Sequence, residues 1–209
     1  MHPFLTRLGI EPEVQAFFEP FYRADELRNL LFDYGDGVEH FGFAFHKVPF
    51  SQNFWMAGNR NFRQVRQVVI CASAMEAVSW LKNKQAAFPF FDGLLFLSAG
   101  VYPLPVHYRW IADHLSVKEF RLVFGRDLTG RVADLKLAAG IRQWPVEIYH
   151  HDDKIVVSFR SEVFFFSQET FSLNAFEKAA KYRFGIPADK PKGFDSYFDQ
   201  LKANAFFAT

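Results

Sequence analysis

The sequence predicts an α/β fold built around a parallel sheet of about four strands. From Gln67 onward, short apolar runs alternate with segments whose apolar residues recur every three to four positions, which is typical of repeated βα units. The chain has 209 residues, of which 50% are hydrophobic and 22% charged. This composition supplies enough apolar surface for a buried core and favours one domain, or one domain with a small appendage.

The first part of the chain, 1–66, is predicted to be an α+β segment. Helical spacing of apolar residues predicts a helix over Glu11–Phe21, and the turn sequence YGDG between two apolar runs predicts a hairpin over Asn29–His46. In the second arm of this hairpin, rings alternate with small residues, so one face is expected to be buried: the rings are Phe41, Phe43 and Phe45.

The central part, 67–150, is predicted to hold the parallel sheet, and the last part, 151–209, a further strand and helices. Four strands are expected, the first of them buried, at Val68–Ile70, Gly93–Gly100, Glu119–Gly125 and Pro145–His150. The helices between them carry single apolar stripes, and the third ends at Gly140. After His150, the sequence HHDD predicts a turn into the strand KIVVSFR, followed by a helix over Ser172–Phe184 and a terminal helix.

Composition also limits the location and the partners of the protein. Cys71 is the one cysteine, so no internal disulfide forms and a reducing cytoplasm is expected. The N-terminal sequence MHPFLTRLGIEPEV lacks the pattern of a secretory signal. The longest apolar runs are far shorter than the roughly 20 residues of a membrane-spanning helix, so no membrane partner is expected.

Two strand-to-helix junctions are the places where chemistry is expected. The sequences VVICASAMEAVSWL and LVFGRDLTGR each join a buried strand to a helix, at the carboxyl edge of the sheet if the strands are parallel. Open α/β sheets bind ligands at this edge. Residues near Ala72, Ser73 and Glu76 are therefore expected to face residues near Asp127 and Arg131.

These two junctions, in this order, resemble the Toprim domain of DNA primases, topoisomerases and related nucleases, in the primase-like branch of phage and mobile elements. The resemblance covers roughly Gln67 to Tyr149. In that family the first strand ends in Glu, where this chain has Ala72, and the third ends in Asp-x-Asp followed by Gly-Arg, where this chain has Gly125, Asp127, Gly130 and Arg131. The resemblance implies a Toprim-like parallel sheet and a role in nucleic-acid metabolism.

The departures from the family pattern predict a degenerate site. Family members hold a divalent cation with clustered carboxylates, because Mg²⁺ prefers hard oxygen ligands. Two of the three expected ligands are uncharged here, so no catalytic residue and no cofactor are expected, and the vestigial site comprises Ala72, Glu76, Gly125 and Asp127. Weak binding of hydrated Mg²⁺ by Asp127 stays open. The simpler interpretation makes Asp127 a helix N-cap and pairs Arg131 with Asp127 or Asp134.

A basic aromatic segment lies upstream of the first junction. From His40 to Met75 there are four Lys or Arg residues and no acid. The net charge of this segment is therefore +4, and that of the rest of the chain is −3. Such cations, interleaved with rings, bind phosphates and stack on unpaired bases. The predicted nucleic-acid-binding residues are Lys47, Trp55, Arg60, Arg63, Arg66 and, from the second junction, Arg131. The competing interpretation is a solvated face of an aromatic-rich chain.

Three functions follow from these observations. The first is a catalytically degenerate Toprim protein that binds single-stranded nucleic acid or has an assembly role. The second is a protein-interaction module without nucleic acid, which the near-zero net charge favours. The third is an active Mg²⁺-dependent phosphoryl-transfer enzyme in which a carboxylate from elsewhere, such as Asp92 or Asp113, completes the site.

Overall fold

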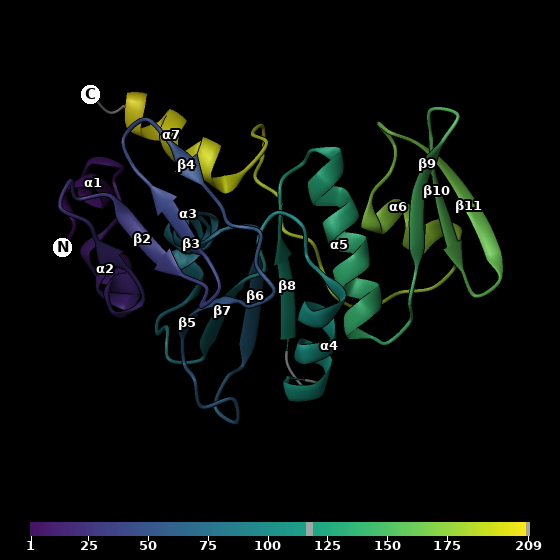
Figure 1. Ribbon diagram of the computed structural model, residues 1–209, viewed down its shortest axis with the longest axis horizontal. Helices are drawn as coiled ribbons and strands as arrows, with labels where there is room; N and C mark the ends of the chain where they lie inside the picture. The colour runs from purple at the N-terminus through teal and green to yellow at the C-terminus, as the bar shows by residue number, and fades with distance from the viewer. Residues whose placement is uncertain (116–118, 208–209) are drawn as a thin grey trace.

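The structure is a computed structural model that describes residues 1–115 and 119–207, and it shows a mixed α/β fold (Figure 1). The central sheet has the strand order β5-β7-β6-β8. Its strands are β5 (Trp55–Gly58), β6 (Gln67–Cys71), β7 (Leu94–Ser98) and β8 (Glu119–Val123). The strand β6 pairs in parallel with both β7 and β8, so the expected parallel core is confirmed for three strands.

The fourth strand of the central sheet is not the predicted one. Residues Glu147–His151 form β9, which pairs antiparallel with β10 (Lys154–Phe159) in a separate sheet completed by β11 (Glu162–Ser167). Asp152 and Asp153 adopt φ of +46° and +58°, the left-handed conformation of a tight hairpin turn, which folds β10 back on β9. The fourth place in the central sheet belongs to β5, which pairs antiparallel with β7.

The N-terminal part of the chain contains both helices and strands. Two short helices, α1 (Pro3–Arg7) and α2 (Pro12–Phe18), precede the 3₁₀ turn η1 (Glu19–Phe21). The expected hairpin forms part of an antiparallel sheet of β1 (Arg23–Ala24), β2 (Leu30–Asp33), β3 (Val38–Phe41) and β4 (His46–Lys47). Its second arm is shorter than expected: β3 ends at Phe41, and the rings of Phe43 and Phe45, which were expected on a buried face, are 74% and 49% exposed in the turn before β4. This segment also supplies β5, so the N-terminal and central parts share one sheet.

Helices cover both faces of the central sheet. Along β6, Val69 and Cys71 pack in a core with α3 (Ala74–Lys84), which ends in the 3₁₀ turn η2 (Gln85–Ala87). Val68 and Ile70 point to the other core, which contains residues of α4 (Pro105–His114) and α5 (Leu128–Ile141). This alternation explains why every residue of β6 is buried.

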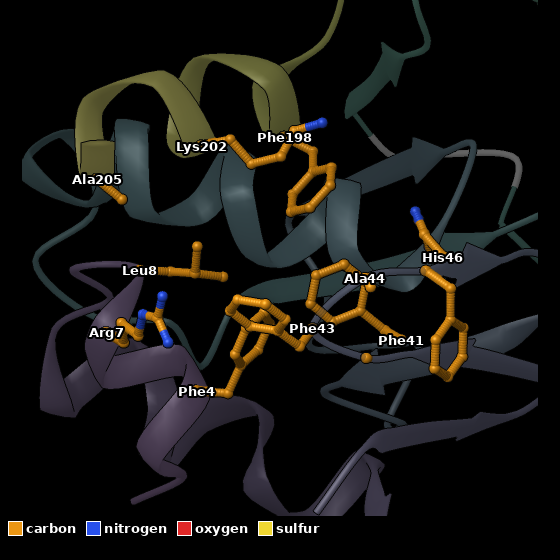
Figure 2. A pocket seen from close by; sticks show the side chains of 12 residues that line it. Phe4, Arg7, Leu8, Phe41, Phe43, Ala44, His46, Phe198, Lys202 and Ala205 are labelled. Atoms are coloured by element: carbon orange, nitrogen blue, oxygen red, sulfur yellow. The ribbon is translucent and has the colours of Figure 1, made fainter. Parts of the chain in front are cut away.

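The C-terminal part contains two helices joined by an extended segment. The helix α6 (Leu173–Ala179) is shorter than predicted, because Lys181 adopts φ of +48° and reverses the chain. Residues 187–189 then run beside β8, with Leu122 N–H donating to Pro187 O at 3.0 Å. The last helix, α7 (Tyr197–Phe207), lies across from α1, with a pocket between them (Figure 2). None of the described helices is long and apolar enough to cross a membrane.

Candidate functional site

The two junctions lie side by side, as the parallel arrangement predicts. Ala72 N–H, which follows β6, donates to Val123 O at the end of β8, at 3.3 Å. The second junction is tightly packed: a Cβ added to Gly130 would lie 2.2 Å from Gly125 O. Only glycine therefore allows the first turn of α5 to sit directly on the end of β8.

Both junctions are closed by side chains that cap the following helix. Ser73 Oγ accepts from Glu76 N–H at 3.0 Å, and Asp127 Oδ1 accepts from Gly130 N–H at 2.9 Å. The N-cap interpretation of Asp127 therefore agrees with the geometry. In the described part of the chain, no group of three His, Cys, Asp or Glu side chains is arranged to hold a metal ion.

Glu76 is buried and holds the start of the last helix. Its carboxylate accepts from Tyr197 N–H at 2.7 Å and Phe198 N–H at 3.1 Å. A negative charge is favourable at the N-terminus of α7, but burial opposes ionisation and raises the pKa of Glu76 to about 7, while the two N–H groups oppose this rise. Glu76 thus connects α3 to α7 across the carboxyl edge.

The segment before α7 covers the end of β8. Arg126 N–H donates to Asp195 O at 2.8 Å, and Lys190 Nζ donates to Phe124 O and Gly125 O, both at 2.9 Å. Lys190 also pairs with the buried carboxylate of Asp134 at 2.5 Å. Burial raises the pKa of Asp134 to about 6, although Lys190 opposes this rise. The end of β8 is therefore occupied by an ammonium group and chain from the C-terminal part.

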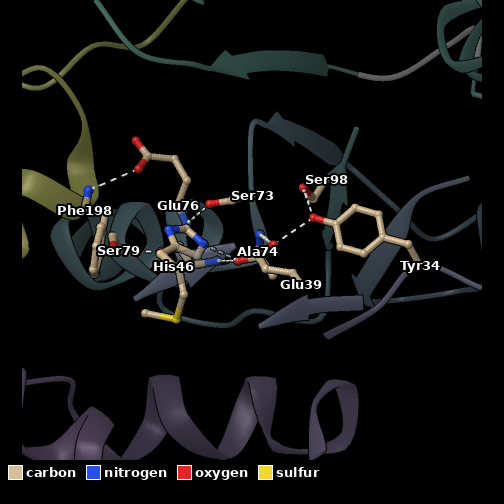
Figure 3. Close-up of polar contacts among 10 residues, drawn as sticks. Tyr34, Glu39, His46, Ser73, Ala74, Glu76, Ser79, Ser98 and Phe198 are labelled. Carbon is tan, nitrogen blue, oxygen red and sulfur yellow. Dashed lines mark hydrogen bonds and ion pairs between the residues drawn. The ribbon is translucent and has the colours of Figure 1, made fainter. Parts of the chain in front are cut away.

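A buried carboxylate that sequence reasoning missed lies at the first junction (Figure 3). Glu39, on β3, is 0% exposed and accepts from the N–H groups of Ala74 at 2.7 Å and Met75 at 3.1 Å, at the start of α3. Tyr34 donates its hydroxyl to Glu39 at 2.8 Å, and the His46 ring nitrogen lies 2.9 Å away. This carboxylate connects the N-terminal sheet to the start of α3.

The strand pattern of the sequence indicates that Glu39 is buried, but it does not indicate which residues Glu39 contacts. Glu39 and Phe41 share the inward face of β3, so the period of two places an acid on the core side. The partners of Glu39 on α3 are about 35 residues further along the chain, and only the tertiary fold brings them together.

Arg131 is engaged with backbone carbonyl groups. Its guanidinium donates to Glu169 O at 3.1 Å and Phe171 O at 3.0 Å, and its Nε to Asp127 O at 3.3 Å. Among the ion pairs of the described residues, none joins Arg131 to Asp127 or Asp134. Arg131 thus fastens the start of α5 to the loop before α6.

The three arginines of the basic segment lie at the opposite edge of the sheet from the two junctions. Arg60, Arg63 and Arg66 are exposed in the connection from β5 to β6, at the amino end of β6. Lys47 is exposed on β4. Trp55 is 2% exposed, and its indole N–H donates to Phe21 O at 2.7 Å. Its ring packs in the core, where it has no face free for a base.

An exposed ring lies beside this connection instead. Phe90 is 82% exposed in the loop before β7. This loop is joined to the arginine loop by Arg66 N–H, which donates to Gly93 O at 2.8 Å, and by the Asn59 side chain, which donates to Asp92 O at 2.8 Å. The exposed acids Asp92 and Glu119 lie at the same edge. We call the group formed by Arg60, Arg63, Arg66 and Phe90 the amino-edge surface.

Comparisons with known proteins give weak likenesses in fold. No protein-family model matches, and no curated protein matches. A crystal structure of the primase fragment of the bacteriophage T7 primase-helicase is similar with a TM-score of 0.46 and 16% identity, over 64% of this chain and 59% of that chain. A structure of the T7 lagging-strand DNA polymerase interacting with primase domains bound to an RNA/DNA hybrid is similar with a TM-score of 0.38 and 10% identity, over 88% of this chain and 70% of that chain. This chain thus spans less than two thirds of the first structure.

Proposed function

We propose that the chain is a primase-like Toprim protein that lacks the metal-dependent step and binds single-stranded nucleic acid. The observation that carries the proposal is the state of the two junctions. The positions that hold carboxylates in the Toprim pattern are Ala72 and Gly125, and the nearby acids Glu76 and Asp127 accept hydrogen bonds from helix N-termini. The covering segment around Lys190 further favours a closed edge over an open metal site.

The amino-edge surface supports the binding role. Its three guanidinium groups are exposed, and the structure gives them no ion pair within residues 1–115 and 119–207, so their charges remain open to an external phosphate. The exposed ring of Phe90 offers a stacking surface, and stacking on a base contributes roughly 1–3 kcal/mol. Unpaired bases are required for such stacking, which favours single strands over duplex.

Fluorescence anisotropy of a labelled oligonucleotide across salt concentrations tests this role. Three phosphate contacts predict a slope of log affinity against log salt of about −2 for a single strand. The triple variant Arg60→Ala/Arg63→Ala/Arg66→Ala is expected to lose most of the affinity and the slope. The matched control removes three exposed lysines elsewhere, as Lys154→Ala/Lys178→Ala/Lys192→Ala, and is expected to retain both. Equal losses in the two variants would contradict a specific surface.

A second candidate function, a protein-interaction module, is favoured by the outer face of the β9–β11 sheet. Tyr149 and Phe165 both pair with Val156, so they form one row across the sheet, and Phe165 is 61% exposed. Exposed apolar rows of this kind mark contact surfaces. Under this candidate, sedimentation velocity would show concentration-dependent self-association that Tyr149→Ser/Phe165→Ser abolishes, together with no binding of the oligonucleotide.

A further inference from the structure

The pocket between α1, the β3–β4 turn and α7 has the features of a ligand site (Figure 2). Its volume is about 530 Å³, within the range of roughly 300–1,000 Å³ that small-molecule sites occupy. Aromatic and aliphatic side chains form its walls: Phe4, Leu8, Phe41, Phe43, Phe45 and Phe198. It shares no lining residue with the amino-edge surface.

The pocket has a floor of packed rings and one wall that is exposed to solvent. Phe41 contacts the rings of Phe4 and Phe198 at centroid distances of 5.2 and 5.1 Å, which fixes the floor of the pocket. Phe43, by contrast, is 74% exposed at the tip of the β3–β4 turn. An exposed ring beside an apolar floor leaves apolar area that a bound molecule would remove from water.

The charge at the rim has one sign. Arg7 lies over the Phe43 ring at 4.9 Å, and Lys202 lies over the Phe198 ring at 4.6 Å, on opposite sides of the pocket. No acid is among the described residues that line it. Lys202 pairs with Asp199 at 2.7 Å outside the lining, whereas Arg7 has no ion pair with any described residue. Arg7 is therefore the main cation at the rim whose charge can bind an anionic ligand.

We propose that this pocket binds a small molecule that joins an apolar body to a single anionic group. The apolar body would lie on Phe41 and Phe198, and the anionic group would accept hydrogen bonds from Arg7, with Lys202 as the second cation. An acyl carboxylate and an aromatic phosphate share this chemistry, and the test below distinguishes them.

Titration of the full chain with 1-anilinonaphthalene-8-sulfonate tests the proposal, because this fluorescent probe is an aromatic anion. Saturable binding is expected. Arg7→Gln is expected to weaken it about tenfold through loss of the charged partner, and Ala205→Trp to weaken it at least as much by filling the pocket. Lys154→Gln, an exposed cation on the separate sheet, is expected to leave it within about twofold. Near-ultraviolet circular dichroism confirms that each variant is folded.

Competition then identifies the source of the anion. Displacement of the probe by dodecanoate indicates an acyl carboxylate, and displacement by 1-naphthyl phosphate indicates an aromatic phosphate. The proposal is overturned if neither displaces the probe, or if folded Arg7→Gln and Ala205→Trp bind it as tightly as the unmodified chain. None of these outcomes depends on whether the protein binds an oligonucleotide.

Discussion

Glu39 lies where the N-terminal sheet meets α3, and its replacement tests whether this buried carboxylate holds the two parts together. Glu39→Ala would leave the N–H groups of Ala74 and Met75 buried without their acceptor, and would remove one partner of Tyr34, which keeps its contact with Ser98. A buried donor without a partner costs about 1–3 kcal/mol. The favourable interaction of the charge with the helix N-terminus is lost as well.

The expected loss in the free energy of unfolding is therefore about 3–6 kcal/mol for Glu39→Ala. This is a large share of the roughly 5–15 kcal/mol that stabilises a typical domain, so this variant is expected to be partly unfolded. Glu39→Gln keeps one acceptor oxygen and the side-chain shape, and its free energy of unfolding is expected to fall by about half as much.

Urea unfolding followed by tryptophan fluorescence measures both changes. The control is Glu147→Gln on exposed β9, which is expected to change the free energy by no more than about 0.5 kcal/mol. A loss below about 1 kcal/mol for Glu39→Ala would show that Glu39 does not hold the two parts together, because water or a neighbouring group would then satisfy the freed donors at little cost.

Three further predictions concern the junctions. Because the pKa of Glu76 is raised to about 7 from 4.5, its ionisation destabilises the fold. Urea unfolding should show the stability of the unmodified chain, relative to Glu76→Gln, falling by about 3 kcal/mol between pH 4.5 and 8; a flat difference would contradict this. Gly130→Ala should cost about 2 kcal/mol or more in thermal unfolding through its clash with Gly125 O, and an unchanged midpoint would count against the packing. Asp127→Ala should cost about 1 kcal/mol of stability yet leave oligonucleotide affinity unchanged, whereas reduced affinity would place binding at the carboxyl edge.

The parallel core could be predicted because its signals are local. The apolar run of β6, the stripe of α3 and the cap Asp127 lie within short stretches of sequence, so the period of these elements and the start of α5 can be recognised from the sequence. The expectation that the two junctions lie close together is met because β6 and β8 are neighbouring parallel strands.

Which sheet a strand joins, and which side chains are buried, depend on contacts between distant parts of the chain that local sequence patterns do not reveal. The strand β9 was expected in the parallel sheet, but its hairpin turn pairs it with β10, and the short strand β5 takes the fourth place in the central sheet. Trp55 stands among exposed cations in the sequence, yet it lies in the core against Phe18 and Phe32. Its neighbours in space come from α2 and β2, which precede it by more than one element.

Calorimetric titration with Mg²⁺ and Mn²⁺ tests the proposal that the carboxyl edge holds no catalytic metal ion. We expect no saturable heat of binding for the unmodified chain and no difference from Asp127→Asn, because Asp127 and Glu76 already accept hydrogen bonds from helix N-termini. Tight binding of either ion that disappears in Asp127→Asn would demonstrate a working metal site. That result would contradict the proposed loss of the metal site and favour an active phosphoryl-transfer enzyme.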